Sequence, residues 1–459
     1  MNTLTLLTLL AAFALGAFYL GRRRSLLAGG GARTLHSLPG YYGFYVVIWC
    51  LIPPLGLMLG WQVFEPRVLT WLIIEGLPES MSSLPQGPLN LLLNDIRNLA
   101  SGDLVVTEVS EVMTQAADRY TALLSSSKFW LSTMTIMLAL AGISLATLRI
   151  TPAFRARNKV ESTVQMILIV ASSIAILTTV GIVFSVLFES IRFFQRVPLD
   201  EFLFGLQWSP QMAIRADQVG SSGAFGFIPL LTGTLLITAI AMVVAVPIGL
   251  MTAVYLTEYA KPAFRSVAKP LLEVLAGIPT VVYGFFAAIQ VAPFIRDSGG
   301  LIGLDVASES ALAAGIVMGI MIIPLVSSLS DDAITAVPAA MRDGSLALGA
   351  TRSETVKQVM LPAALPGIVG GVLLAVSRAI GETMIVVMAA GLAANLTANP
   401  LEAVTTVTVQ IVTLLVGDQE FDSAKTLAAF ALGLMLFLVT LVLNVIGLRV
   451  VRKYREAYE

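Results

Sequence analysis

Long apolar runs, separated by shorter polar segments, recur along the whole chain. About 20 residues of helix cross a hydrocarbon core of about 30 Å, and these runs are continuously apolar instead of alternating, which disfavours a transmembrane β-barrel. The pattern predicts an all-α integral membrane protein with about nine transmembrane helices. These helices are expected at about 3–20, 41–60, 130–149, 163–188, 227–256, 270–295, 310–329, 363–392 and 426–448.

The composition agrees with lipid as the main solvent. Hydrophobic residues make up 57% and charged residues 12% of the 459 residues, against about 45–50% and about 25% in soluble domains. The single cysteine, Cys50, excludes an internal disulfide, and the single histidine, His36, argues against a histidine metal centre or a Ser-His-Asp triad. A formal net charge of −1 gives no reason to expect nucleic acid as a partner.

The distribution of Lys and Arg predicts the orientation of the helices. The first apolar run is followed, and not preceded, by Arg22, Arg23 and Arg24, which indicates an uncleaved helix with its N-terminus outside and not a secretory signal. With that start, nine helices place the C-terminus in the cytoplasm. The expected cytoplasmic segments hold 18 of the 28 basic residues, and they are 21–40, 149–162, 257–269, 330–362 and 449–459.

A change in organisation part-way along the chain predicts two domains. Residues 1–160 are interpreted as an N-terminal extension with three transmembrane helices and a long extracytoplasmic loop, 61–129, that forms a small domain. In that loop, 104–124 has the apolar spacing of a helix, and the Pro-, Gly- and Ser-rich stretch 78–88 is expected to be mobile. Residues 161–459 hold six helices with short connections.

The predicted cytoplasmic loop 330–362 has more internal order than a simple connector requires. Asp331 and Asp332 are expected to start one short helix that Pro338 interrupts. A second short helix is expected to pause at Gly349, before a charged amphipathic helix over 351–360. Two short helices in this position make a lever that another protein can hold.

The spacing within this loop resembles the EAA loop of importer-type ABC permeases. Gly349 is followed by nine residues and then by Val359-Met360-Leu361-Pro362, where the family has a glycine, nine residues and Ile-x-Leu-Pro. The usual Glu-Ala opening is here Asp343-Gly344, and Gly344 lowers helix propensity by about 1 kcal/mol relative to Ala. In that family the loop docks in a groove of the ATPase subunit. The resemblance implies docking through Arg342, Asp343, Gly344, Leu348, Gly349, Ala350 and Thr351.

Three further motifs resemble the phosphate-specific (Pst) permeases, and their form is closer to the C-type than to the A-type subunit. They are Phe225-Gly226-Phe227 with Leu231-Thr232-Gly233-Thr234-Leu235, Gly277-Ile278-Pro279-Thr280-Val281-Val282-Tyr283-Gly284, and Ser377-Arg378-Ala379-Ile380-Gly381-Glu382-Thr383-Met384. The resemblance covers about 160–459, and the first 160 residues are similar to the N-terminal extension of longer C-type permeases.

The Pst resemblance implies a fold, a function and a set of partners. The last six helices are expected to form a type I ABC importer permease core in a bacterial inner membrane, passing inorganic phosphate inward by alternating access. The implied partners are a second, homologous A-type permease, an ATPase dimer and an extracytoplasmic phosphate-binding protein. No cofactor is expected on this chain, because it lacks a Walker motif. ATP and Mg²⁺ are expected on the ATPase, so this chain is a transport subunit and not an enzyme.

Two ionisable residues fall inside the predicted eighth helix. Arg378 and Glu382 are four residues apart and are expected to share one helix face, although each charge alone costs about 2.5–3.5 kcal/mol at the membrane centre. Arg378 offers a guanidinium fork that matches phosphate oxygens. Glu382 is expected to hold Arg378 and to accept a proton from a protonated phosphate oxygen, with Ser377 and Thr383 as hydroxyl contacts. A salt bridge that joins helices, or binds the second permease, is the alternative.

Other residues in the predicted spans have simpler interpretations. Glu273, four residues after Lys269, is expected to form an ion pair with it at a helix end. Pro247 and Pro279 are expected to kink their helices.

Three other functions stay open at the level of sequence. The first is an ABC permease for another tetrahedral oxyanion. The second is a secondary transporter driven by an ion gradient, for which inverted repeats and several midplane ionisable residues would be expected. The third is a membrane regulator that senses through 61–129.

Overall fold

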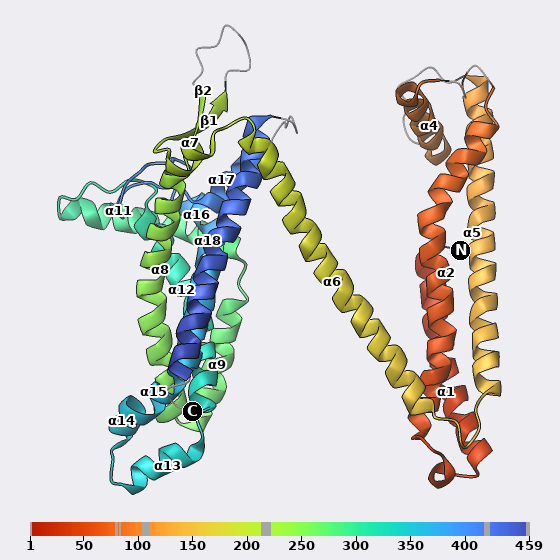
Figure 1. Ribbon diagram of the computed structural model, residues 1–459, viewed down its shortest axis with the longest axis horizontal. Helices are drawn as coiled ribbons and strands as arrows, with labels where there is room; N and C mark the ends of the chain where they lie inside the picture. Colours follow the sequence, from red (N-terminus) through yellow and green to blue (C-terminus); the bar gives the residue numbers. More distant parts are fainter. Residues whose placement is uncertain are drawn as a thin grey trace. The chain divides into compact units, whose positions relative to one another are not determined.

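The computed structural model describes residues 2–78, 81, 84–102, 110–212, 222–416 and 423–455. The chain divides into two compact units, Met1–Leu177 and Thr178–Glu459, and each is described by itself. The first holds α1 (Thr3–Gly29), α2 (Pro39–Glu75), α4 (Gln86–Ser101) and α5 (Glu111–Leu148), with a 3₁₀ turn at Ala32–Thr34 (Figure 1). Helix α6 (Ala156–Phe194) continues from the first unit into the second.

The second unit is built from shorter and more varied elements. They are α7 (Leu199–Phe204), β1 (Trp208–Met212), β2 (Ser222–Phe225), α8 (Ile228–Val254), the π segment η2 (Tyr255–Tyr259), α9 (Pro262–Ala276), α10 (Thr280–Phe286), the π segment η3 (Ala287–Val291), α11 (Ala292–Leu301), α12 (Ala311–Thr335), α13 (Ala339–Ala347), α14 (Arg352–Thr355), the π segment η4 (Val356–Met360), α15 (Leu361–Ile380), α16 (Met384–Ala389), α17 (Val407–Leu415) and α18 (Ala424–Arg455).

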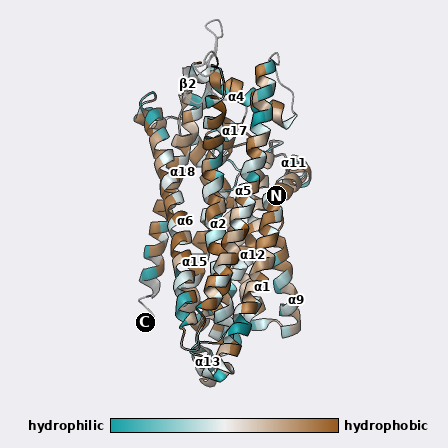
Figure 2. Ribbon diagram, turned by 90° about the vertical axis from the view of Figure 1, so that its right-hand side faces the viewer, coloured by the Kyte–Doolittle hydropathy of each residue, from teal (hydrophilic) through white to brown (hydrophobic). Residues whose placement is uncertain are grey.

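The prediction of a nine-span, helical membrane protein is confirmed. Within the described residues, eight helices are long and apolar enough to cross a membrane, and the bent pair Pro262–Ala276 and Thr280–Leu301 makes a ninth if it is one span. Each predicted apolar run falls on one of them. Figure 2 shows hydrophobic residues over most of the helical surface, with hydrophilic residues gathered near the ends, as around α13. The short antiparallel hairpin β1–β2 is an addition that hydropathy did not predict.

In the first unit, α1, α2 and α5 pack along an interior of small and apolar side chains. A Cβ on Gly142 of α5 would overlap the Trp49 carbonyl oxygen of α2, so the two backbones are in close contact. The same face of α5 buries Ser132, Thr135, Ala139 and Ala146. Small residues let membrane helices approach closely, because lipid supplies no hydrophobic driving force between them.

The loop 61–129 is mostly a continuation of membrane helices. Helix α2 runs to Glu75, and α5 begins at Glu111, where the Ser110 hydroxyl accepts a hydrogen bond from the Met113 amide. Helix α4 lies between them, and the cluster joining these elements contains Ile73, Leu93, Ile96 and Ala117. Residues 79–80 and 82–83 of the predicted mobile stretch, and 104–109 of the predicted helix, lie outside the described residues.

The second unit is centred on α12, which packs against α8, α9 and α15. It is the most buried of the candidate spans in the described chain. Gly315 and Gly319 lie against Ile240 and Val244 of α8, so the helices approach closely along this face. A long buried helix of this kind can carry polar groups that partners on several neighbours satisfy.

Two predicted spans are broken. The sixth bends by 85° between α9 and α10, where Gly277 and Pro279 interrupt the helix; Pro279 had predicted a kink. The eighth was predicted as one helix over 363–392, and this is wrong. Helix α15 ends at Ile380, and α16 begins at Met384 after a short turn.

The loop 330–362 forms two short helices, but it starts later than predicted. Asp331 and Asp332 do not begin a helix, because α12 continues through them to Thr335. Helix α13 follows Pro338, and Gly349 then takes a left-handed conformation with φ +89°. The next helix starts at Thr351 with a capping box, in which the Thr351 and Glu354 side chains each bond the other residue's backbone amide.

Candidate functional site

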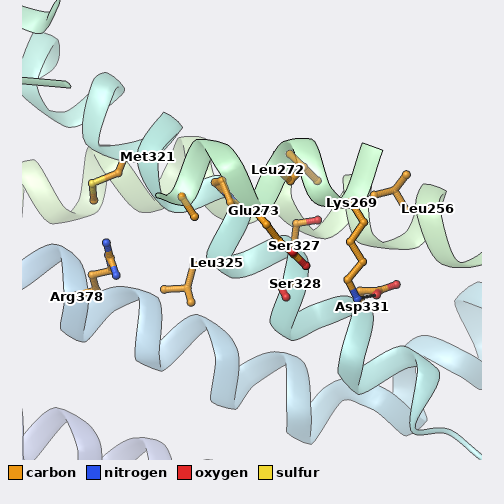
Figure 3. A pocket seen from close by; sticks show the side chains of 12 residues that line it. Leu256, Lys269, Leu272, Glu273, Met321, Leu325, Ser327, Ser328, Asp331 and Arg378 are labelled. Carbon is orange, nitrogen blue, oxygen red and sulfur yellow. Dashed lines mark hydrogen bonds and ion pairs between the residues drawn. The ribbon is translucent and has the colours of Figure 1, made fainter. Parts of the chain in front are cut away.

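A cavity of about 250 Å³ lies among α9, α12 and α15 of the second unit. Figure 3 shows Arg378 of α15 at one end and the pair Lys269 and Asp331 at the other, with Ser327 and Ser328 nearer the pair. The remaining lining is mostly apolar. The full lining is Leu256, Lys269, Leu272, Glu273, Ala276, Met321, Pro324, Leu325, Ser327, Ser328, Asp331 and Arg378.

Helical spacing explains why these residues face one cavity. On α12, Met321, Leu325, Ser328 and Asp331 recur every three or four residues. On α9, the lining residues recur in the same way, as Lys269, Leu272, Glu273 and Ala276. Side chains three or four apart lie on the same helix face, so α9 and α12 each present one stripe to the cavity.

Asp331 is the centre of an ion-pair network at one end of the cavity. Its side chain is 6% exposed, and its carboxylate accepts from Arg265 Nη2 at 2.8 and 3.0 Å and from Lys269 Nζ at 2.7 Å. The Thr257 hydroxyl donates to the same carboxylate. Lys269 also lies 3.7 Å from Asp332. The network joins η2, α9 and α12.

The predicted ion pair of Lys269 with Glu273 is wrong. Both residues are on the cavity face of α9, but Lys269 reaches across to α12, where Asp331 is buried and needs a cation. The Glu273 carboxylate makes no hydrogen bond or ion pair with any described residue, although the backbone carbonyl of Glu273 accepts from the Gly277 amide. Spacing along one helix predicted the pair, and tertiary packing supplied a stronger partner.

The predicted shared face of Arg378 and Glu382 is also wrong. Arg378 lies in the last turn of α15 and lines the cavity, and its guanidinium makes no hydrogen bond or ion pair to any described residue. Glu382 lies past the helix end, and its carboxylate accepts from the backbone amides of Met384 (3.1 Å) and Ile385 (3.4 Å). Glu382 therefore caps α16, because those amides at a helix start need an acceptor.

The two predicted hydroxyl contacts also have other partners. Ser377 donates to Asn444 Oδ1 of α18 at 3.2 Å. Thr383 is the residue before α16, and its hydroxyl lies 3.5 Å from the Gly381 carbonyl oxygen. Neither residue lines the cavity, so of the four predicted path residues the structure places only Arg378 there.

Comparison with known proteins agrees with this division of the chain. A family described as phosphate ATP-binding cassette transporter matches residues 7–178, and one described as binding-protein-dependent transport system inner membrane component matches residues 245–456. The probable ABC transporter permease protein YqgH of Bacillus subtilis is 32% identical over 289 residues, which are 62% of this chain and 86% of that protein. The phosphate transport system permease protein PstC 1 of Mycobacterium bovis is 30% identical over 248 residues, 50% of this chain and 73% of that protein.

The chain belongs to the PstC family of ABC transporter permeases. A solved bacterial alginate ABC transporter, in complex with an alginate pentasaccharide-bound periplasmic protein, aligns with a TM-score of 0.46 at 16% identity, over 66% of this chain and 99% of that one. That structural likeness is weak, and the family assignment depends on the sequence relatives.

In this PstC-family chain, the segment from α13 to η4 is tied to the transmembrane helices by a second buried acid. Arg342 Nη1 of α13 lies 3.5 Å from Glu258 Oε1 of η2, and the Glu258 side chain is 6% exposed. The neighbouring Thr257 donates to Asp331. The neighbouring residues Glu258 and Thr257 of η2 therefore connect α13 with the end of the cavity through one polar contact each.

The predicted docking residues of the loop differ in exposure. Asp343, Gly344, Leu348, Gly349 and Thr351 are exposed, with Leu348 91% exposed, while Arg342 and Ala350 are half-buried. An exposed leucine at a turn between two helices is available to a partner protein. Their role in docking stays a prediction.

The sequence analysis did not identify Glu258 as a buried acid, and it did not identify Arg265 and Lys269 as the cations that bind Asp331. A signal was present, because Asp331 and Glu258 are acids at the ends of apolar runs, where an unpaired charge is unfavourable. Their partners are 62 to 84 residues away in sequence, and no local pattern identifies them.

Proposed function

We propose that this chain is the membrane-spanning subunit of an ATP-driven importer and passes inorganic phosphate into the cytoplasm. Relatives named as phosphate transport permeases support the substrate. The observation that carries the proposal is the Arg378 guanidinium, which faces a cavity among three helices and has no partner among the described residues. A guanidinium in this position binds a tetrahedral oxyanion through two parallel hydrogen bonds.

The cavity is suited to transient binding. Its walls are mostly apolar, so an anion inside is held by few polar groups. The cation at the far end, Lys269, is already neutralised by Asp331 and Asp332. Net charge around the cavity is therefore close to zero, and an anion attracted by Arg378 is not trapped there.

The loop 330–362 is the proposed contact with the ATPase dimer. Closure of the ATPase on bound ATP and Mg²⁺ would displace α13, and Arg342 would carry the displacement to η2 through Glu258. Thr257 and Asp331 continue this connection to α9 and α12, which form two walls of the cavity. Alternating access then follows from relative movement of these helices.

The remaining partners belong to the same proposal. A second, homologous permease completes the path, and an extracytoplasmic phosphate-binding protein delivers the substrate. The orientation inferred from Lys and Arg, with the N-terminus outside and the C-terminus in the cytoplasm of a bacterial inner membrane, puts 330–362 on the ATPase side.

The proposal is tested by uptake of labelled phosphate at low external concentration, in cells whose own high-affinity phosphate system is deleted. Cells with the complete transporter are expected to take up phosphate, and excess sulfate is expected not to compete. Arg378→Ala is expected to lower uptake at least about tenfold at an unchanged protein level, since a charge-assisted bidentate contact is lost. If cells with the wild-type transporter took up no phosphate, phosphate would be refuted as the substrate. Equal uptake by Arg378→Ala and wild type would refute the site.

A further inference from the structure

One buried hydroxyl on the cavity wall is unexplained by contacts within the chain. Ser327 of α12 is 2% exposed and lines the cavity, and its side chain makes no hydrogen bond to any described residue. Buried polar side chains nearly always have a partner. Some buried helical hydroxyls in this unit bond the backbone of the preceding turn, as Thr234 does to the Leu230 carbonyl. Ser330 of α12 makes no such bond among the described residues either, but of the two serines Ser327 lines the cavity. Ser327 thus keeps a donor directed at the cavity.

A second unpaired group faces the same cavity from α9. Glu273 lies on the stripe that includes Lys269, but Lys269 is bound to Asp331 and Asp332. Glu273 therefore keeps a free carboxylate. When it is ionised, this group accepts hydrogen bonds but cannot donate them. Ser328, one residue after Ser327, also lines the cavity and has no partner among the described residues. Two donor hydroxyls and one acceptor carboxylate are thus left free in the cavity that Arg378 lines at one end.

We propose that Ser327, Ser328 and Glu273 form a subsite that selects a protonated tetrahedral oxyanion inside the permease. The serine hydroxyls donate to unprotonated oxygens of the anion, Arg378 neutralises its charge, and the Glu273 carboxylate accepts the hydrogen bond of its remaining O–H group. This inference rests on the proposed function, and it assigns to Glu273 the acceptor role that the sequence had suggested for Glu382.

The chemistry distinguishes phosphate from sulfate. Inorganic phosphate at neutral pH has at least one O–H group, which can donate to Glu273, whereas sulfate has none and would place a bare oxygen against the carboxylate. A repulsive contact against the wrong ligand is an effective source of selectivity. A site that hydrogen-bonds an O–H group also rejects an analogue without that group strongly, because the polar groups of the site are then left unpaired. The permease would thus add a second selection step after the binding protein.

The test uses the complete transporter, purified in lipid nanodiscs without its binding protein, so that selectivity belongs to the membrane subunits. The apparent Kd is measured from the rise in thermal stability with inorganic phosphate, and separately with sulfate at matched ionic strength. Wild type is expected to bind phosphate more tightly than sulfate. Ser327→Ala is expected to weaken phosphate binding by about three- to tenfold, as for loss of one hydrogen bond, and Ser327→Thr to retain it.

Matched controls separate the subsite from general effects on the fold. Ser330 is a buried serine on the same helix, 1% exposed and not part of the cavity lining, so Ser330→Ala is expected to leave the Kd unchanged. Glu273→Gln removes the repulsion of sulfate and is expected to lower the phosphate-to-sulfate preference about tenfold. Glu309→Gln, at an exposed carboxylate outside the cavity, is expected to leave it unchanged.

Two results would overturn the subsite. One is the same phosphate affinity for Ser327→Ala and Ser330→Ala; if Ser327→Ala does not fold, Ser328→Ala takes its place in this comparison. The other is an unchanged preference in Glu273→Gln. Equal losses in Ser327→Ala and Ser327→Thr would indicate packing and would also contradict it. Phosphate uptake by cells with wild-type transporter tests the proposed function separately, so a transporter that imports phosphate but shows none of these effects refutes the subsite alone.

Discussion

The two units of the chain use membrane helices in different ways. In the first unit, α1, α2 and α5 are unbroken, and their interior is built from apolar and small side chains. In the second unit, two spans are interrupted, three π segments occur, and α9, α12 and α15 carry Lys269, Asp331 and Arg378 at the cavity. Both units are mostly helical and apolar, but in the second unit two acidic and two basic side chains line one cavity between helices.

The difference indicates where movement and binding are located. Charged groups are expensive near lipid and are retained mostly for function, and π segments inside α-helices occur often at functional sites. Close backbone contact, as between α2 and α5, leaves two helices little room to move past each other. The first unit is therefore expected to act as a rigid body, whereas the second contains the elements that change arrangement.

The largest effect is expected at the centre of the ion-pair network. Asp331→Asn removes the shared partner of Arg265 and Lys269 and leaves two cations at a partly buried site. Breaking a buried ion pair costs about 3–5 kcal/mol, and because the two cations are each 34% exposed, we expect about 2–4 kcal/mol. The measurement is thermal unfolding of the purified transporter.

Asp332 is the matched control for this prediction. It is the next residue, its side chain is 68% exposed, and it lies 3.7 Å from Lys269. Exposed ion pairs contribute about 0–1 kcal/mol, so Asp332→Asn is expected to change stability little. Similar losses in the two variants would mean that the network does not hold α9 to α12.

A smaller effect is expected from the close helix contact of the first unit. Gly142→Ala places a methyl group against the Trp49 carbonyl oxygen, so α5 must move away from α2. Overpacking of this kind costs about 1–3 kcal/mol. Cys50, the single cysteine of the chain, is fully buried beside this contact and reports on it directly. Its reaction with a maleimide is expected to become faster.

Gly56→Ala tests whether that result is specific. Gly56 also lies on α2, but a Cβ there meets nothing within 4 Å. Its substitution is expected to leave the labelling rate of Cys50 unchanged. Faster labelling in Gly56→Ala, or unchanged labelling in Gly142→Ala, would contradict an interior held by backbone contact.

The sequence predicted the helices of both units well, but it predicted the side-chain contacts of the second unit poorly. Each apolar run predicted one of the eight or nine candidate spans of the described residues, because solvation by lipid acts on each helix separately. The turn at Gly349 and the helix that begins at Thr351 were also predicted, since capping residues and glycine act locally. Where one helix and its immediate neighbours decide the structure, the pattern was sufficient.

Side-chain partners in the second unit were not predictable in this way. Spacing of four residues suggested Arg378 with Glu382 and Lys269 with Glu273, and both pairs are absent from the described structure. In the first case the helix ends before Glu382, whose carboxylate is used to cap α16. In the second, Asp331 on another helix competes for Lys269. Breaks in helices and contacts between distant segments are tertiary properties, and the candidate site depends on both.

The smallest effect on stability, but a specific one on function, is expected at the contact between α13 and η2. Arg342→Glu places like charges at Arg342 and the buried Glu258, whereas Arg342→Glu with Glu258→Arg reverses the pair. Because Arg342 is 41% exposed, we expect a stability change of about 1 kcal/mol or less.

If the pair transmits movement of α13, the single variant lowers phosphate uptake per ATP hydrolysed severalfold, and the reversed pair restores part of it. Uptake and hydrolysis are measured in the same proteoliposomes with binding protein present. A single variant that loses uptake and hydrolysis in proportion would show instead that Arg342 only helps the ATPase to dock, and the movement would then have to enter the second unit through another contact.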